Sequence, residues 1–145
     1  MKKLLLILPI LLASLTMMAG DKKEDTKAGI SFREMSWKDA MTKAKKENKL
    51  IFIDVYTTWC GPCKLLKKNT FPDKALGEYF NKNFVNIAID AEQGEWIEFA
   101  QQQRIQGYPT LLIMDKDGKE VSRTMGYMPA EQLLEFGKSV KTKKK

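Results

Sequence analysis

The chain of 145 residues has two cysteines, and both lie in the segment WCGPC, residues 59–63. Two intervening residues hold the sulfurs of Cys60 and Cys63 within bonding distance, so the pair can open and close as a disulfide. A structural zinc site needs four ligands, whereas the chain has no histidine and no third cysteine. We therefore predict thiol-disulfide exchange at this pair. A disulfide that only braces the fold is the alternative.

No other redox centre is expected in this chain. The sequence contains no phosphate-binding loop and no nicotinamide or flavin fingerprint. Electrons must then arrive by thiol exchange, and we predict that the protein uses no metal and no other cofactor.

The residues around the cysteines predict a strand that leads into a helix. Pro62 suits the first turn of a helix, where its missing N–H is no loss. Unpaired N–H groups at this helix start would stabilise a thiolate on Cys60, which is therefore the predicted nucleophile. Cys63, one helical turn further into the protein, is the predicted resolving thiol.

Asp54 is the one charged residue in the segment LIFIDVY, residues 50–56. The segment is otherwise apolar, as is typical of a strand buried on both faces. Burial disfavours the ionised form of a carboxyl group, so we expect the pKa of Asp54 to be raised. A carboxylate that caps a neighbouring backbone group at the strand end is the alternative.

Apolar spacing predicts the elements that position this junction. A helix is expected from Trp37 to Asn48, with Ser36 and Asp39 as a variant of the capping box at its start. The other expected elements are a buried strand at 84–90, a helix within 92–103, a strand and turn at 110–118, a returning strand at 119–125 and a closing helix after Pro129. Two β-α units followed by a hairpin and a helix predict an α/β fold, a mixed sheet with helices on both faces.

The N-terminal residues have the layout of an export signal. Lys2 and Lys3 precede a short apolar run, as in a secretory signal peptide, and an uncleaved membrane anchor is the alternative. We expect a signal peptide at 1–20, a flexible linker at 21–30, one domain at 31–140 and a basic tail at 141–145. The mature protein is then expected to be soluble and periplasmic or extracellular.

The net charge of +7 is modest for a chain with 30% charged residues. Basic and aromatic residues do not alternate along a platform that could stack bases, so we expect no nucleic-acid partner. A monomer is expected.

Three segments resemble a thioredoxin, and the resemblance covers about residues 31–140. They are IDVYTTWCGPCK, FVNIAID and RIQGYPTLLIMDKDGKEV, and Gly126 follows them. A WCGPC segment with a downstream Gly-x-Pro-Thr is a specific pairing of motifs. DVYTTWC, NTFPDKAL and RTMGYMPAEQL are more similar to the C-terminal thioredoxin-like domain of the thiol:disulfide interchange protein DsbD. The resemblance implies a three-layer α/β/α fold around a central mixed β-sheet, and protein disulfides as substrates.

The resemblance also implies roles for individual residues. Asp54 matches a buried aspartate that takes the proton of the resolving thiol through water, and Pro109 matches a cis-proline that faces the cysteines. Pairing of this backbone with an extended substrate makes substrate-binding candidates of Gly107, Tyr108, Pro109 and Gly126. The remaining candidates form the environment of the cysteines: Trp59, Gly61, Pro62 and Lys64. Trp59 is expected either to cover the site or to pack in the core.

The sequence departs from the thioredoxin pattern at Asn86. The family has a lysine there, four residues before Asp90. Losing that positive charge is expected to make Asp54 still harder to ionise.

The direction of electron flow has two opposing indications. The Gly-Pro pair between the cysteines resembles reducing thioredoxins, whose potential is about −270 mV. An exported thiol pair, however, lies among oxidants, so a reductase there implies a membrane-bound thiol donor of electrons. A net oxidant or isomerase is the alternative, and a non-catalytic binding module is a further one.

Overall fold

The computed structural model describes residues 28–142. The expected signal peptide, the linker up to residue 27 and the end of the basic tail lie outside the described residues. Within the described part, four strands form one mixed sheet in the order β2-β1-β3-β4. They are β1 (Leu50–Tyr56), β2 (Phe84–Asp90), β3 (Thr110–Met114) and β4 (Glu120–Met125). β1 pairs in parallel with β2 and antiparallel with β3, and β3 pairs antiparallel with β4.

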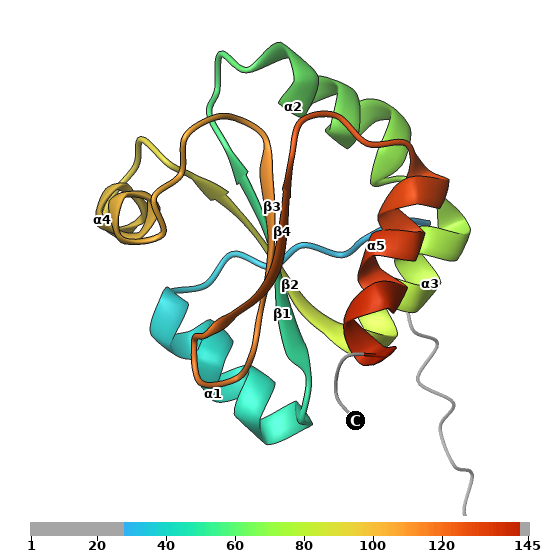
Figure 1. Cartoon of the computed structure of the whole chain (residues 1–145), viewed down its shortest axis with the longest axis horizontal. Helices are drawn as coiled ribbons and strands as arrows, with labels where there is room; N and C mark the ends of the chain where they lie inside the picture. Colours follow the sequence, from blue (N-terminus) through green and yellow to red (C-terminus); the bar gives the residue numbers. More distant parts are fainter. Residues whose placement is uncertain (1–27, 143–145) are drawn as a thin grey trace, which may run out of the picture.

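Helices cover both faces of the sheet (Figure 1). α1 and α4 lie on one face, whereas α2, α3 and α5 lie on the other. Their bounds are α1 (Trp37–Glu47), α2 (Gly61–Leu65), α3 (Lys74–Asn83), α4 (Glu95–Gln102) and α5 (Ala130–Thr142), with a π-helical turn, η1 (Leu66–Thr70), directly after α2. The predicted three-layer α/β/α architecture is therefore confirmed.

Each face of the sheet has its own hydrophobic core, because side chains alternate between the faces along a strand. Ile51, Ile53 and Val55 of β1 pack toward α1 and α4. Leu50 and Phe52 belong to the core that α3 and α5 close. The even-numbered positions of β1, Asp54 among them, thus face the layer that contains α2, η1, α3 and α5.

The predicted cap of the first helix is present. Oγ of Ser36 accepts a hydrogen bond from the backbone N–H of Asp39 at 3.1 Å, and the hydroxyl donates to the Asp39 carboxylate at 2.8 Å. The helix ends at Glu47, and its C-cap residue Asn48 adopts a left-handed conformation with φ of 51°. Asparagine tolerates this conformation better than most residues, so the sequence predicts both ends of this helix.

Two features of the fold were not predicted. α3 was missed, although Asp73 accepts a cap hydrogen bond from the N–H of Leu76 at 2.8 Å. The packed chain also reaches back to Gly29, at the end of the expected linker. Gly29 and Gly77 lie so close that a Cβ on Gly77 would meet the Gly29 backbone at 2.3 Å.

Within residues 28–142, none of the helices combines the length and the apolar character needed to cross a membrane.

Candidate active site

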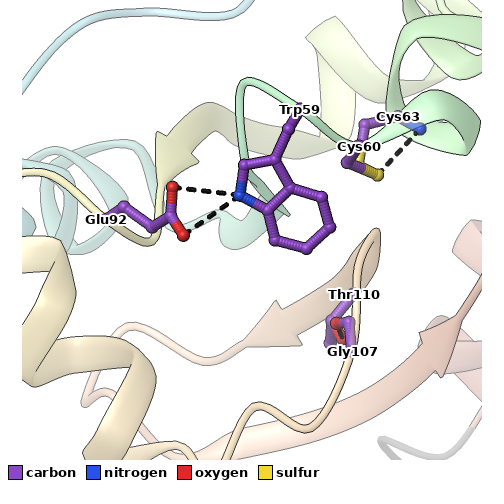
Figure 2. The surroundings of a disulfide bond; sticks show 6 residues. All are labelled: Trp59, Cys60, Cys63, Glu92, Gly107 and Thr110. Atoms are coloured by element: carbon purple, nitrogen blue, oxygen red, sulfur yellow. Dashed lines mark hydrogen bonds between the residues drawn. A yellow bond between two sulfur atoms is a disulfide. The ribbon is translucent and has the colours of Figure 1, made fainter.

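Cys60 and Cys63 form a disulfide at the start of α2, with an S–S distance of 2.05 Å (Figure 2). Cys60 is the N-cap residue of the helix, and its Sγ accepts a hydrogen bond from the N–H of Cys63 at 3.2 Å. Only 3% of Cys60 and 1% of Cys63 is exposed. The helix start thus directs a backbone donor at one sulfur, the arrangement that favours negative charge on that atom after reduction.

The Trp59 side chain lies on the surface beside the disulfide and is 64% exposed. Its ring nitrogen donates to the two carboxylate oxygens of Glu92 at 3.1 and 3.2 Å, and Figure 2 shows this edge turned away from the sulfurs. The interpretation of Trp59 as core packing is therefore wrong. Glu92 was not among the predicted site residues, although it follows β2 by two positions.

The loop that contains Pro109 contacts Trp59 through the neighbouring Tyr108. The two rings meet edge to face, with centroids 5.9 Å apart. The peptide bond between Tyr108 and Pro109 is cis, as the resemblance implied. Hydrogen bonds hold the loop, because Thr110 Oγ1 donates to the Gly107 carbonyl at 2.7 Å and the Gly126 N–H donates to the Pro109 carbonyl at 2.9 Å. The structure thus brings together all four predicted substrate-binding residues.

Backbone conformation explains why residue 126 is a glycine, and close packing explains why residue 107 is one. Gly126 has φ of +97°, which L side chains rarely adopt, and an added Cβ would meet no atom within 4 Å. At Gly107, by contrast, a Cβ would approach the Met125 sulfur to 2.8 Å. A side chain at Gly126 would therefore extend into the open space beside the cis-proline loop.

The other predicted environment residues lie on α2. Gly61, Pro62 and Lys64 are all exposed. They form part of the accessible surface on either side of the buried Cys63.

Asp54 is completely buried on β1, with 0% of its surface exposed. Neither carboxylate oxygen has a hydrogen-bond partner among the described protein groups. Loss of hydration raises the pKa of Asp54 to about 7, although the positive charge of Lys67 acts in the opposite direction. The predicted rise of this pKa is therefore supported, and the carboxyl group exchanges its proton near neutral pH.

Asn86 lies on β2 opposite Phe52 of β1 and is 3% exposed. Its amide nitrogen donates to the Asn81 side chain at 3.1 Å. The cation near Asp54 is instead Lys67 of η1, which sequence reasoning missed. The available signal was the position of Lys67 in the sequence, four residues, or about one helical turn, after Cys63.

The described geometry supports a definite chemistry. A reversible disulfide lies at a helix start, and a carboxyl group that titrates near pH 7 lies beneath the same helical layer. The helix start can stabilise a thiolate, and the carboxyl group can accept or return a proton. Both properties can assist thiol-disulfide exchange.

Comparisons with known proteins identify the same arrangement. The family profile described as "Thioredoxin-like domain" matches residues 37–141. The thiol:disulfide interchange protein DsbD of Pseudoalteromonas atlantica is 31% identical over 103 residues, which cover 69% of this chain and 17% of that protein. Thioredoxin-1 of Saccharomyces cerevisiae is 36% identical over 84 residues, 58% of this chain and 75% of the relative. The chain thus spans about a sixth of the length of the DsbD relative.

A solved structure extends the similarity to three dimensions. The solution structure of a candidate disulphide-isomerase from Bacteroides thetaiotaomicron has a TM-score of 0.72 and 42% sequence identity. The match covers 81% of this chain and 98% of that one.

Proposed function

We infer that this chain, which belongs to the thioredoxin-like domain family and is a thiol-disulfide oxidoreductase with a Cys60–Cys63 pair, acts as an exported reductase of protein disulfides. The observation that carries the proposal is the disulfide at the start of α2, where the Cys63 N–H is directed at the Cys60 sulfur. The described form is the oxidised product of one reaction cycle.

In the first step, Cys60 of the reduced protein acts as nucleophile. Its thiolate attacks one sulfur of a substrate disulfide, so a mixed disulfide forms and the other substrate sulfur leaves as a thiolate. The N–H groups at the helix start stabilise the attacking thiolate before the step. The cap hydrogen bond to Cys60 Sγ in the disulfide supports this role, because reduction leaves the same donor in place.

In the second step, Cys63 resolves the mixed disulfide. Asp54 in its ionised form takes the thiol proton of Cys63 through water, and the resulting thiolate attacks Cys60 Sγ. The second substrate sulfur then leaves, and two electrons have passed from the dithiol to the substrate. A carboxyl group with a pKa of about 7 suits this task, since a base is most effective when its pKa lies near the working pH.

Protein substrates are proposed to bind across the surface formed by Trp59, Tyr108 and Gly126. Trp59 is 64% exposed beside the disulfide, and the open space at Gly126 leaves room for a partner backbone. An extended substrate segment would pair with the backbone of the cis-proline loop.

Export and the electron donor belong to the same proposal. The charged and apolar pattern of residues 1–20 supports export by a signal peptide. Outside the cytoplasm the pair would remain oxidised without a supply of electrons, so the proposal includes a membrane-bound thiol donor. We further propose that the folded domain, residues 31–140, works as a monomer.

Insulin reduction with dithiothreitol tests the exchange chemistry. Cys60→Ser is expected to abolish turnover and to form no mixed disulfide with a substrate. Cys63→Ser is the matched variant, because it retains the nucleophile and should accumulate the mixed disulfide that it cannot resolve. Unchanged turnover in Cys60→Ser would contradict the assignment of Cys60.

A second candidate function is disulfide isomerisation, which the description of the Bacteroides thetaiotaomicron structure favours, and net oxidation is a further alternative. The reduction potential of the pair, measured by equilibration with glutathione, distinguishes these functions. A value of about −270 mV supports a reductase, a value of about −180 mV supports an isomerase, and a value of about −120 mV supports an oxidant.

A further inference from the structure

We propose that Lys67 supplies the positive charge that controls ionisation of Asp54, and that it is thereby a positioning residue for the step in which Cys63 resolves the mixed disulfide. The inference rests on the proposed role of Asp54 as the proton acceptor in that step. It assigns to η1 the electrostatic task for which the thioredoxin pattern has a lysine on β2.

Lys67 and Asp54 line one pocket of about 330 Å³ on the α2, α3 and α5 side of the sheet. Its other lining residues carry no charged side chain: Ala28, Ile30, Phe32, Phe71, Pro72 and Ala88. A charge acts more strongly across such an apolar space than across water, because the effective dielectric constant is lower. Lys67 is itself exposed whereas Asp54 is fully buried, so their coupling is weaker than that of a buried pair but stronger than that of two exposed groups.

The π-helical turn places Lys67 over the strand that contains Asp54. The N–H of Phe71 donates to the Leu66 carbonyl at 2.9 Å, a bond that spans five residues and widens the helix at this point. The Lys67 ammonium then lies 3.5 Å from the centroid of the Tyr56 ring. Tyr56 follows Asp54 by two positions on β1, so both side chains are on the same face of the sheet.

Several titratable groups surround Asp54 in residues 28–142, and among them Lys67 carries the positive charge. On β1 the neighbour is Tyr56, whose pKa is raised by burial and by the negative charges of Asp90 on β2, Asp54 itself and Glu34 in the segment before α1. On β2 and β3 the residues opposite Asp54 are Ala88 and Leu111, and neither carries a charge. No other group of this set lowers the pKa of Asp54 against the rise that its loss of hydration causes.

The family's lysine position cannot perform this task here. Asn86 is uncharged, and its amide is engaged with Asn81 at 3.1 Å. The positive charge that acts on Asp54 in this chain is therefore that of Lys67. The charge comes from η1, which directly follows the helix that contains Cys63, and Lys67 lies four residues after this resolving thiol.

Carboxyl ¹³C NMR of Asp54 in the oxidised protein tests the coupling directly, since disulfide-bonded cysteines do not titrate. Lys67→Met keeps the length of the side chain and removes its charge. It is expected to raise the Asp54 midpoint by about one pH unit, and Lys67→Arg is expected to restore the wild-type value. Lys68→Met, at the adjacent exposed residue of η1, is the matched control and should leave the midpoint unchanged. An unchanged midpoint in Lys67→Met would overturn the proposal.

Kinetics of the reduced protein test the positioning role of Lys67 separately from the proposed role of Asp54 as the base. The rate of mixed-disulfide resolution is measured against pH, and its midpoint in Lys67→Met should move upward with that of Asp54. If the NMR midpoint moves while the rate profile does not, Asp54 is not the base. The positioning role of Lys67 is then overturned, whereas its coupling to Asp54 stands.

Discussion

Replacement of Asp54 by asparagine is expected to raise the free energy of unfolding of the oxidised protein. The gain is expected only above about pH 4, where Asp54 of the unfolded chain ionises. Burial raises the pKa of Asp54 from 3.8 to about 7, so the folded state holds this proton more tightly than the unfolded chain does. Below about pH 4 both states are protonated, and the ionisation of Asp54 costs nothing. Between about pH 4 and 7 only the unfolded chain ionises, and wild-type stability falls as the pH rises. Above pH 7 both states are ionised and the loss is complete.

The size of the effect follows from the two pKa values. They differ by about three pH units, and each unit corresponds to about 1.4 kcal/mol. Ionisation of Asp54 therefore destabilises the folded state by about 4 kcal/mol at pH 8. Urea unfolding of the oxidised wild type and of Asp54→Asn, repeated from pH 4 to 8.5, measures this quantity. The difference between the two free energies of unfolding should grow by about 4 kcal/mol across the series.

Comparing the wild type with Asp54→Asn cancels the contributions that other titrating groups make to the free energy of unfolding. Ion pairing lowers the pKa values of Glu47 and Glu120, so both proteins lose some stability toward acid pH by the same amount. Any constant effect of the asparagine amide also cancels, because only the change with pH is used. A free-energy difference that stays constant from pH 4 to 8 would refute the raised pKa and leave Asp54 without its basis as a proton acceptor. In the reduced protein the same variant should slow resolution more than the initial attack, which stopped-flow kinetics can separate.

Two further predictions concern the substrate surface and the fold. Gly126→Ala forces an L residue into φ of +97°, which should cost about 1–2 kcal/mol in urea unfolding. Because the new methyl group enters the proposed partner surface, kcat/KM should fall for insulin but not for a small aromatic disulfide; equal losses for both would argue against a contact role. Ser36→Ala removes the cap of α1 and should lower the unfolding free energy by about 1 kcal/mol, with insulin reduction unchanged. A loss below the precision of the urea experiment would mean that this cap is replaced by another donor or acceptor.

Much of the fold could be predicted because its signals are local. The buried strands β1 and β2 appear in the sequence as runs of mostly apolar and β-branched residues, interrupted by Asp54 in β1 and by Asn86 and Asp90 in β2. Pro62 locates the start of α2, and a charge within LIFIDVY identifies Asp54 as unusual. α3 had comparable signals, since Asp73 caps it and Leu76 and Phe80 repeat at helical spacing, but they follow a proline and were not interpreted as a helix.

The electrostatics of the site could not be predicted, because they depend on contacts between distant residues. The coupling of Lys67 to Asp54 requires both the π-helical turn and the packing of η1 against β1, and neither has a sequence signature. The exposure of Trp59 depends likewise on Tyr108 and Glu92, which lie 49 and 33 positions away in the chain. A tryptophan beside a cysteine suits a core and a surface equally well from sequence alone.

The geometry of the site also bears on the direction of electron flow. A carboxyl group with a pKa of about 7 is present in both protonation states near neutral pH. Its ionised form can take the proton of Cys63 when the dithiol reduces a substrate, and its protonated form can return that proton when a donor reduces the disulfide. In the proposed mechanism Asp54 therefore assists exchange in both directions and selects neither. Net direction must come from the relative stability of the dithiol and the disulfide, together with the potentials of the partners. This is why the reduction potential distinguishes a reductase from an oxidant, whereas the rate of insulin reduction alone does not.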